Sequence, residues 1–458
     1  MRREAGKRIS ALALAAATAA MALVGCSGGG STNETTAAAQ TTAQADGAQT
    51  TEAQSEQAQA PGSDGEEVTI RLVHYMGEQA KRDALDAMLA AFSESYPNIK
   101  VDVEVVASSS YIATYKNYIA AGEAPDIMFG KPQNMTEFVE GGYFMDLTGE
   151  KCLENVLPML ADECTVNGGI YGFPIDAQVK ACFYNKKMFE EANLEVPQTK
   201  DEFFKVCDTF MEQGIYPFVH PYNFIHGVFH ELDSFFTSMA ASTGNENVWM
   251  DSQNGVKDLA GNPVITDALE MFSKFASYKD AGDTAVDQTQ GIQNFAAGQR
   301  PMYMNGGWLM GDVIAANPEG EFGMFPTPWS DNPDENKLWV GIDDVFIVSS
   351  QTEHKDEVMA LLEFFDNEEC SKTWMDTAKL MTSNVTVPTD DADAFIKEIK
   401  SYIDNDRIVS KALVPDYTSE FSTAFRTKLQ EFVTLDDSQR DVAKLIQEID
   451  TEIGSIRQ

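Results

Sequence analysis

Strand-like and helix-like patterns alternate between residues 68 and 129, and this order constrains the fold more than any other feature of the sequence. β-Branched residues alternate with polar ones in the segments 68–74 and 100–106, and the segment 127–129 is short and apolar, so all three are predicted strands. Apolar residues recur at helical spacing in 81–92, and a second helical stretch, 111–121, ends at a glycine. The order β-α-β-α-β predicts a doubly wound α/β fold, in which ligands bind beyond the carboxyl ends of the strands.

The length and charge of the chain exclude several classes of protein. A chain of 458 residues suggests two or more domains, or one large two-lobed body, and 43% apolar residues suffice for sizeable cores. Lys and Arg number 33 against 72 Asp and Glu, which gives a formal net charge of −39. Nucleic acids and anionic lipids attract basic proteins, so we expect neither a nucleic-acid partner nor adhesion to lipid through a basic patch.

The first residues have the pattern of a lipoprotein signal peptide. A head with four Lys and Arg residues precedes an apolar run over 9–24, which is shorter than the roughly 20 residues that span a bilayer. The run ends in Leu-Val-Gly-Cys, which resembles the bacterial lipobox, a motif whose cysteine becomes acylated. We therefore predict that residues 1–25 are a signal peptide. Acyl chains such as palmitate on Cys26 would then hold the protein on the outer face of the cell membrane, as in Gram-positive bacteria.

The segment after the predicted anchor has the composition of a tether. Between Ser27 and Glu67 there is no Leu, Ile, Val, Met or aromatic residue. Such a segment cannot bury enough apolar surface to offset the entropy lost on ordering. Residues 26–67 are therefore predicted to be a disordered linker between the lipid anchor and a folded body that begins at residue 68.

The spacing of cysteines and histidines favours neither a metal nor a cofactor. Besides Cys26 there are five cysteines, an odd number, so at least one is free or pairs between molecules. Cys152 and Cys164 could form a disulfide in an exported protein, and buried single thiols are an equal alternative. His226 and His230 are four residues apart, as in zinc-binding helices, but a glycine replaces the glutamate of that motif. We expect no metal ion and no cofactor.

Several short motifs in the body resemble one family of exported proteins. They are Ala-Pro-Asp-Ile at 124–127, Tyr-Gly-Phe-Pro-Ile-Asp at 171–176, Phe-Tyr-Asn-Lys-Lys at 183–187, Val-Pro-Gln-Thr at 196–199, Phe-Ala-Ala-Gly at 295–298, Gly-Gly-Trp at 306–308 and an apolar helix at 357–365. Their order and spacing resemble family 1 of the extracellular solute-binding proteins, the maltose-binding-protein-like substrate-binding lipoproteins of ABC-type sugar importers. One position departs from the family, because Lys200 stands where a tryptophan is usual.

The resemblance implies two doubly wound α/β lobes joined by a hinge, which is the periplasmic-binding-protein-like clamp. It places the first lobe at 68–176 and 345–393 and the second at 177–344 and 394–458. It also implies a function: a monomer without enzymatic activity that captures a carbohydrate of oligosaccharide size between the lobes and delivers it to the permease subunits of an ABC transporter.

Sugar chemistry selects the candidate ligand contacts. Sugars present apolar C–H faces that stack on aromatic rings, and hydroxyl groups that need donors and acceptors. Trp308 follows two glycines and matches a tryptophan that stacks on sugar rings in the family. The other candidates follow predicted strands, including one at 216–218, or lie at the two crossings between lobes: His74, Tyr75, Met76, Lys131, Gln133, Asp176, Gln178, His220, Tyr222, Asn223, Asp343 and Asp344.

Three other functions remain open from the residues alone. A secreted acidic protein could be a glycoside-active enzyme, which needs two carboxyl groups across one sugar bond, and any acidic chain offers many such pairs. The chain contains neither the Gly-x-Ser-x-Gly of hydrolases nor a phosphate-binding loop. A binding protein could also take a non-sugar solute, such as a polyamine or a peptide, and a surface adhesin is the third alternative.

Overall fold

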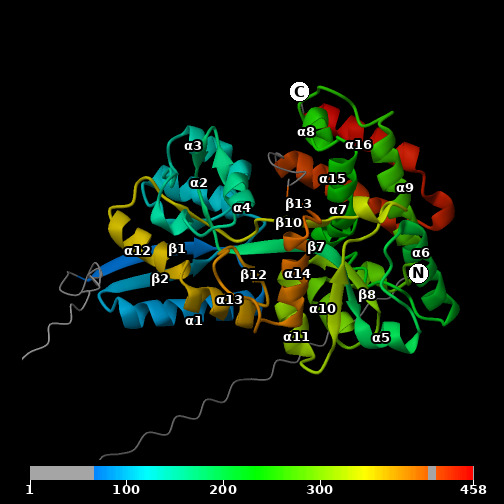
Figure 1. Cartoon of the computed structure of the whole chain (residues 1–458). Helices are drawn as coiled ribbons and strands as arrows, with labels where there is room; N and C mark the ends of the chain where they lie inside the picture. Colours follow the sequence, from blue (N-terminus) through cyan, green and yellow to red (C-terminus); the bar gives the residue numbers. More distant parts are fainter. Residues whose placement is uncertain (1–66, 411–418, 457–458) are drawn as a thin grey trace, which may run out of the picture. The chain divides into compact units, whose positions relative to one another are not determined.

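The computed structural model describes residues 67–410 and 419–456, and all of them belong to one compact unit. The predicted signal peptide, the anchoring Cys26 and almost all of the predicted linker lie outside the described residues. Two larger β-sheets organise the described part of the chain (Figure 1). We call each of these sheets, with the helices that pack on it, a lobe: the first lobe contains strand β1 and the second contains strand β7.

The sheet of the first lobe has the strand order β2-β1-β3-β11-β6. β1 is parallel to β2 and β3, whereas β11 is antiparallel to β3 and β6. The strands are β1 (Val68–His74), β2 (Ile99–Val105), β3 (Ile127–Phe129), β6 (Phe173–Pro174) and β11 (Val345–Val348). The predicted alternation of strands and helices between residues 68 and 129 is confirmed.

The helices of the first lobe are held by one another and by a buried tyrosine. They are α1 (Gln79–Ser95), α2 (Tyr111–Ala121), α3 (Thr136–Glu140), α4 (Pro158–Glu163), α12 (Lys355–Phe365) and α13 (Glu368–Ala378), and the hairpin of β4 (Thr165–Val166) and β5 (Gly169–Ile170) follows α4. α1 packs against α12 and α13 (Figure 1). The Tyr115 hydroxyl donates to the Val73 carbonyl (3.1 Å) and accepts from the Phe129 amide (3.2 Å), so it connects α2 to β1 and β3.

The sheet of the second lobe is built around its longest strand, β7. β7 (Asp176–Asn185) pairs antiparallel with β8 (Met302–Gly306), β9 (Phe322–Phe325), β10 (Leu338–Gly341) and β12 (Met381–Thr382), and β10 pairs with β13 (Ile408–Val409). The helices are α5 (Lys186–Glu191), α6 (Lys200–Glu212), α7 (Ile225–Ser242), α8 (Val248–Gln253), α9 (Pro263–Ser277), α10 (Gln288–Ala296), α11 (Met310–Ala316), α14 (Ala394–Asp404), α15 (Ser419–Thr434) and α16 (Val442–Ile456). α7 packs on β7, β8 and β10.

The two faces of β7 have different surroundings, because side chains alternate along a strand. The odd-numbered residues from Ala177 to Phe183 are buried in one apolar cluster, and the even-numbered Cys182 and Tyr184 belong to another. The first three residues on the even-numbered face are instead polar or charged: Asp176, Gln178 and Lys180. One face of β7 is therefore polar near the first lobe and apolar farther along the strand.

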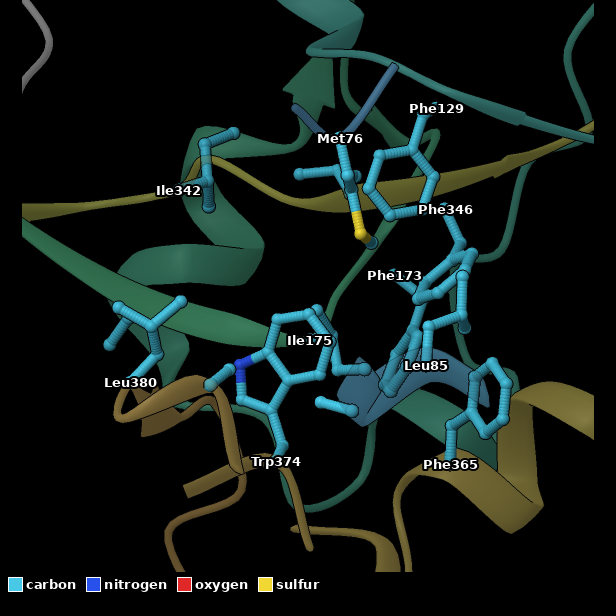
Figure 2. Packing of buried hydrophobic residues seen from close by; sticks show 14 of the residues in the cluster. Met76, Leu85, Phe129, Phe173, Ile175, Ile342, Phe346, Phe365, Trp374 and Leu380 are labelled. Atoms are coloured by element: carbon cyan, nitrogen blue, oxygen red, sulfur yellow. The ribbon is translucent and has the colours of Figure 1, made fainter. Parts of the chain in front are cut away.

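The core of the first lobe contains one of the predicted ligand contacts. Met76 is 2% exposed, and Figure 2 shows its side chain close to Phe129 and Phe346. Trp374 of α13 lies in the same core beside Ile175 and Leu380 (Figure 2). Met76 therefore packs in the apolar core of the first lobe, and its contact with a ligand remains a prediction.

Two short connections, which we call the crossings, join strands of the two sheets, and a longer one through α12 and α13 leads from β11 to β12. Only Ile175 separates β6 from β7, and the residues 342–344 separate β10 from β11. β12 lies within the segment 345–393, which was predicted for the first lobe, yet it pairs with β7 of the second sheet. The exact boundaries of the lobes remain a prediction.

Two further expectations can be compared with the structure. The predicted strand at 216–218 is wrong: only an isolated bridge joins Phe218 to Met302, because Pro217 has no N–H group to extend a ladder. Of the two alternatives for Cys152 and Cys164, the structure has buried free thiols, as it does for Cys182, Cys207 and Cys370. No helix within 67–410 or 419–456 is long and apolar enough to cross a membrane.

Candidate functional site

The polar half of β7 and the two crossings form a cluster of charged side chains around one buried lysine. Lys81 of α1 is 2% exposed, and its Nζ lies 2.7 Å from Asp344 Oδ2 and 3.2 Å from Asp343 Oδ2. Lys131, which follows β3, lies 3.0 Å from Asp343 Oδ1. Asp343 is therefore shared between two lysines of the first lobe.

The other crossing joins the same cluster through Asp176. The Asp344 amide donates to Asp176 Oδ1 (3.4 Å), and Gln178 Nε2 donates to Asp176 Oδ2 (2.8 Å). Two residues beyond Gln178 on the same face of β7, Lys180 pairs with Asp233 of α7. The contacts of Asp176, Asp343 and Asp344 connect both crossings and α1 in one polar network, and the Lys180–Asp233 pair lies beside it on the same face of β7.

Burial and charge act against each other on these groups. Burial raises the pKa of Asp344, and the nearby Lys81 only partly opposes this. Burial would also raise the pKa of Asp343, but Lys131 and Lys81 together lower it below its usual range. Burial would lower the pKa of Lys81, yet Asp344 and Asp343 raise it well above its ordinary value. Lys81 and Asp343 are therefore charged at neutral pH.

Aromatic rings from both lobes border this network. In the first lobe, the Tyr75 ring lies 4.4 Å from the Tyr111 ring between centroids. In the second lobe, the Trp308 ring lies 5.0 Å from the His230 ring of α7, and Lys180 Nζ lies 4.4 Å above the Trp339 ring. Rings of this kind can take the apolar face of a ligand.

Two glycines leave room for the tryptophan rings on either side of β7. A Cβ atom at Gly306 would lie 2.0 Å from Cζ3 of Trp308, and one at Gly341 would lie 2.4 Å from Cζ2 of Trp339. Gly306 of β8 pairs with Lys180 of β7, and Gly341 of β10 pairs with Gln178 of β7. Any side chain at these positions would collide with the tryptophan rings, so both positions require glycine.

Several buried polar atoms around this surface have no hydrogen-bond partner among the described residues. They are Gln178 Oε1, Glu163 Oε1, His230 Nδ1 and Trp339 Nε1. Gln178 Oε1 lies 3.5 Å from the position of a Cβ at Gly307, and Glu163 Oε1 lies 2.9 Å from that of a Cβ at Gly341. Buried polar atoms are nearly always paired in proteins, so these four atoms are candidates for hydrogen bonds to water or to a bound polar molecule. We call these four residues, with Trp308 and Gly341, the β7 floor.

The structure brings together most of the predicted contacts. Tyr75, Lys131, Asp176, Asp343 and Asp344 belong to the network or border it, and Gln178 and Trp308 belong to the β7 floor. Gln133 is partly exposed in the short helix Pro132–Met135 beside Lys131. The positions of these residues agree with the expectation, and their contact with a ligand remains a prediction.

The remaining predicted contacts lie elsewhere. His74 is 2% exposed, and its Nδ1 accepts from the Met76 amide. His220 and Tyr222 are buried within the second lobe, where both bind Glu231 at 2.6 and 3.1 Å. Asn223 is exposed, and its amide donates to the Val286 carbonyl. The buried His220 Nε2 has no hydrogen-bond partner among the described residues, and contact of these residues with a ligand remains a prediction.

Sequence reasoning missed Lys81, Glu163 and Lys180 as parts of the site. Lys180 could have been found, because it continues the two-residue period of Asp176 and Gln178 on β7. Lys81 and Glu163 carry no such signal, since only the packing of α1 and α4 brings them to the crossings.

The site has no features of a metal centre. In the described residues, no group of three or more His, Cys, Asp or Glu side chains is placed to hold a metal ion. Burial lowers the pKa of His226 to about 4 and that of His230 well below its ordinary value. Both imidazoles are therefore neutral at pH 7.

Comparisons with known proteins agree with this architecture. Residues 77–369 match the model of the family described as bacterial extracellular solute-binding protein. The multiple sugar-binding protein of Streptococcus mutans is 26% identical over 320 residues, which cover 66% of this chain and 73% of that relative. The melibiose/raffinose/stachyose-binding protein MelE of Bacillus subtilis is 23% identical over 288 residues, which cover 62% and 66%.

Solved structures show the same fold. The solute-binding protein RafE in complex with raffinose superposes with a TM-score of 0.73 at 22% identity, covering 85% of this chain and all of that one. At this identity the likeness concerns the fold alone, which is the two-lobed α/β fold of periplasmic binding proteins. Since the family model spans more than half of the sequence, the chain belongs to the bacterial extracellular solute-binding proteins.

Proposed function

We propose that this protein is the substrate-binding lipoprotein of an ABC importer, and that it captures a carbohydrate of oligosaccharide size on the β7 floor. The observation that carries the proposal is the group of unpartnered buried atoms between two indole rings. Gln178 Oε1 accepts, Trp339 Nε1 donates, and neutral His230 Nδ1 lies beside the Trp308 ring. Sugar hydroxyls both donate and accept, so one ligand can satisfy all of these atoms.

Relatives support the choice of ligand. The names of the Streptococcus mutans and Bacillus subtilis relatives describe sugar-binding proteins, and the RafE structure contains raffinose. The lobes would close on such a sugar, with the first lobe formed by 68–176 and 345–393 and the second by 177–344 and 394–458. The crossings beside Asp176 and Asp343 would then serve as the hinge.

The charges of the site disfavour the other candidate functions. A polyamine needs free carboxylates, whereas Lys81, Lys131 and Lys180 already neutralise the site carboxylates Asp343, Asp344 and Asp233. A retaining or inverting glycosidase needs one carboxyl group on each side of the sugar bond. Here the ionised carboxylates are held in ion pairs, which favours binding without turnover.

The sequence supports a place outside the cell membrane. Cleavage before Cys26 would remove residues 1–25, and the acylated Cys26 with the linker 26–67 would tether the folded body as a monomer. The permease subunits of the transporter would receive the sugar there.

A ligand screen tests the proposal. The full-length chain, kept in detergent, is heated with raffinose, stachyose or chitin oligosaccharides, and with spermidine or a tetrapeptide as controls. A sugar at a hundred times its Kd should stabilise the protein by roughly 2.7 kcal/mol, and prolonged incubation should leave it intact. Stabilisation by spermidine or the peptide alone would assign another solute, and steady release of monosaccharides would make the protein an enzyme.

A further inference from the structure

Glu163 is the one carboxyl group of the β7 floor, and the backbone around it fixes its position. It is the last residue of α4, a helix that packs against β6 and β10. Its Oε2 accepts from the Ile342 amide at 3.3 Å, directly after β10. Its Oε1 is buried and has no partner within 67–410 and 419–456.

The free oxygen of Glu163 lies next to Gly341 and the Trp339 ring. It lies 2.9 Å from the position of a Cβ at Gly341, which also lies against the Trp339 ring. Gly341 stands opposite Gln178 on β7. Glu163 and Trp339 therefore meet at Gly341, and Glu163 Oε1 and Trp339 Nε1 both lack a partner among the described residues. Gln178 Oε1, which also lacks one, lies nearer Gly307 on the β8 side of β7.

We propose that Glu163 is a specificity-determining ligand contact, whose Oε1 forms a hydrogen bond with a hydroxyl group of the sugar on the Trp339 side of the β7 floor. This inference rests on the proposed function and adds to it a residue of α4. It explains why a carboxyl oxygen is buried without a partner, since the ligand supplies one.

The surroundings of Glu163 determine whether its carboxyl group is protonated, and therefore whether it donates or accepts the hydrogen bond. Burial raises the pKa of Glu163 to about 8, and the Ile342 amide, Lys131 and Lys180 lower it only partly. Both lysines are themselves engaged, Lys131 with Asp343 and Lys180 with Asp233. Glu163 is thus an uncharged acid at pH 7, and the contact is a donation from its O–H group to the sugar oxygen.

Three neighbouring groups have pKa values raised further above already high ordinary values. Burial raises the pKa of Tyr75 and of the neighbouring Cys164 well above their ordinary values. Asp343 opposes the burial of Lys131 and raises its pKa. Ionisation of Glu163 between pH 7 and 9.5 removes the donated hydrogen. Burial also raises the pKa of Asp176, beside Gln178, well above its ordinary value, so the variant Glu163→Gln is needed to assign a pH dependence to Glu163.

Binding of raffinose to the full-length chain in detergent, measured by calorimetry from pH 7 to pH 9.5, tests the inference. With a pKa of about 8, affinity should fall about thirtyfold over this range, because only the protonated form binds. Glu163→Gln keeps a donor of the same shape, so it should bind within about threefold of the wild type at pH 7 and lose the pH dependence. Glu163→Ala should bind at least tenfold more weakly.

The controls separate this inference from the proposed function. Glu137→Gln changes an exposed glutamate that pairs with Lys116, and it should keep the wild-type affinity and pH profile. Melting of each variant without sugar shows whether it folds. Parallel pH profiles for the wild type and Glu163→Gln, or full affinity of Glu163→Ala, would overturn the role of Glu163 alone. Absence of binding by raffinose, stachyose and chitin oligosaccharides to the wild type would overturn the proposed function, and the inference with it.

Discussion

Replacing Lys81 with methionine tests whether the polar network holds the two crossings together. Methionine keeps the apolar stem of the lysine in the core of α1 and removes only its charge. Asp343 retains Lys131 at 3.0 Å, but Asp344, whose side chain is 3% exposed, loses the ammonium group 2.7 Å away. One buried carboxylate is left without its counter-charge.

The stability that Lys81→Met is expected to lose, measured as free energy of unfolding, follows from that single carboxylate. Breaking a buried ion pair costs about 3–5 kcal/mol, and the retained pair of Asp343 places this case near 3 kcal/mol. In the variant, burial of Asp344 is no longer opposed by Lys81, so its folded-state pKa rises further above the unfolded value of about 3.9. A raised carboxyl pKa favours folding at low pH and disfavours it as pH rises, so the loss should be larger at pH 7 than at pH 4.

Urea unfolding of the wild type and Lys81→Met at both pH values measures these differences. Lys116→Met is the matched control, because Lys116 is 51% exposed in its pair with Glu137 and should contribute less than about 1 kcal/mol. Adding Asp344→Asn to Lys81→Met removes the stranded charge and should restore most of the lost stability. A loss equal to that of the control, or no recovery in the double variant, would refute the reasoning.

Three other changes examine the site and the anchor. Trp308→Ala should weaken sugar binding by about 2 kcal/mol, or roughly thirtyfold in Kd, whereas Trp374→Ala in the core should instead lower the free energy of unfolding by about 3–5 kcal/mol; equal stability losses would place Trp308 in the core. Gly341→Ala puts a Cβ 2.4 Å from the Trp339 ring, so calorimetry should show at least about tenfold weaker binding, while Gly454→Ala, with open space around its Cβ, should bind normally. Cys26→Ala should move the protein from the membrane pellet to the supernatant, and continued sedimentation with membranes would contradict the anchor.

The strands and helices of the first lobe were predictable because their signals are local. The segment 111–121 ends where Gly122 adopts a left-handed conformation (φ 73°), and the strand at 68–74 has the observed limits. The strand predicted at 216–218 failed for an equally local reason, the missing N–H of Pro217, which the pattern of apolar residues concealed.

The site was predictable only where it lies at strand ends. Asp176, Gln178 and Asp343 mark the crossings in the sequence, and the structure gathers them. His220 was also predicted from its place after a predicted strand, but its ring is buried inside the second lobe, where it forms a hydrogen bond with Glu231 of α7. Glu163 and Lys81 come from helices, and only tertiary packing decides which helical side chain reaches a crossing.

The five buried thiols have a consequence for the lifetime of the protein outside the cell. Extracellular surroundings permit oxidation, yet all five cysteines of the folded body are free and inaccessible. A molecule that unfolds exposes an odd set of thiols, which cannot all pair within one chain, and any disulfide formed then has no counterpart in the native fold. A molecule whose thiols oxidise while it is unfolded cannot regain the native fold until they are reduced again. In an oxidising medium, slow unfolding therefore protects these five thiols and prolongs the useful life of each molecule.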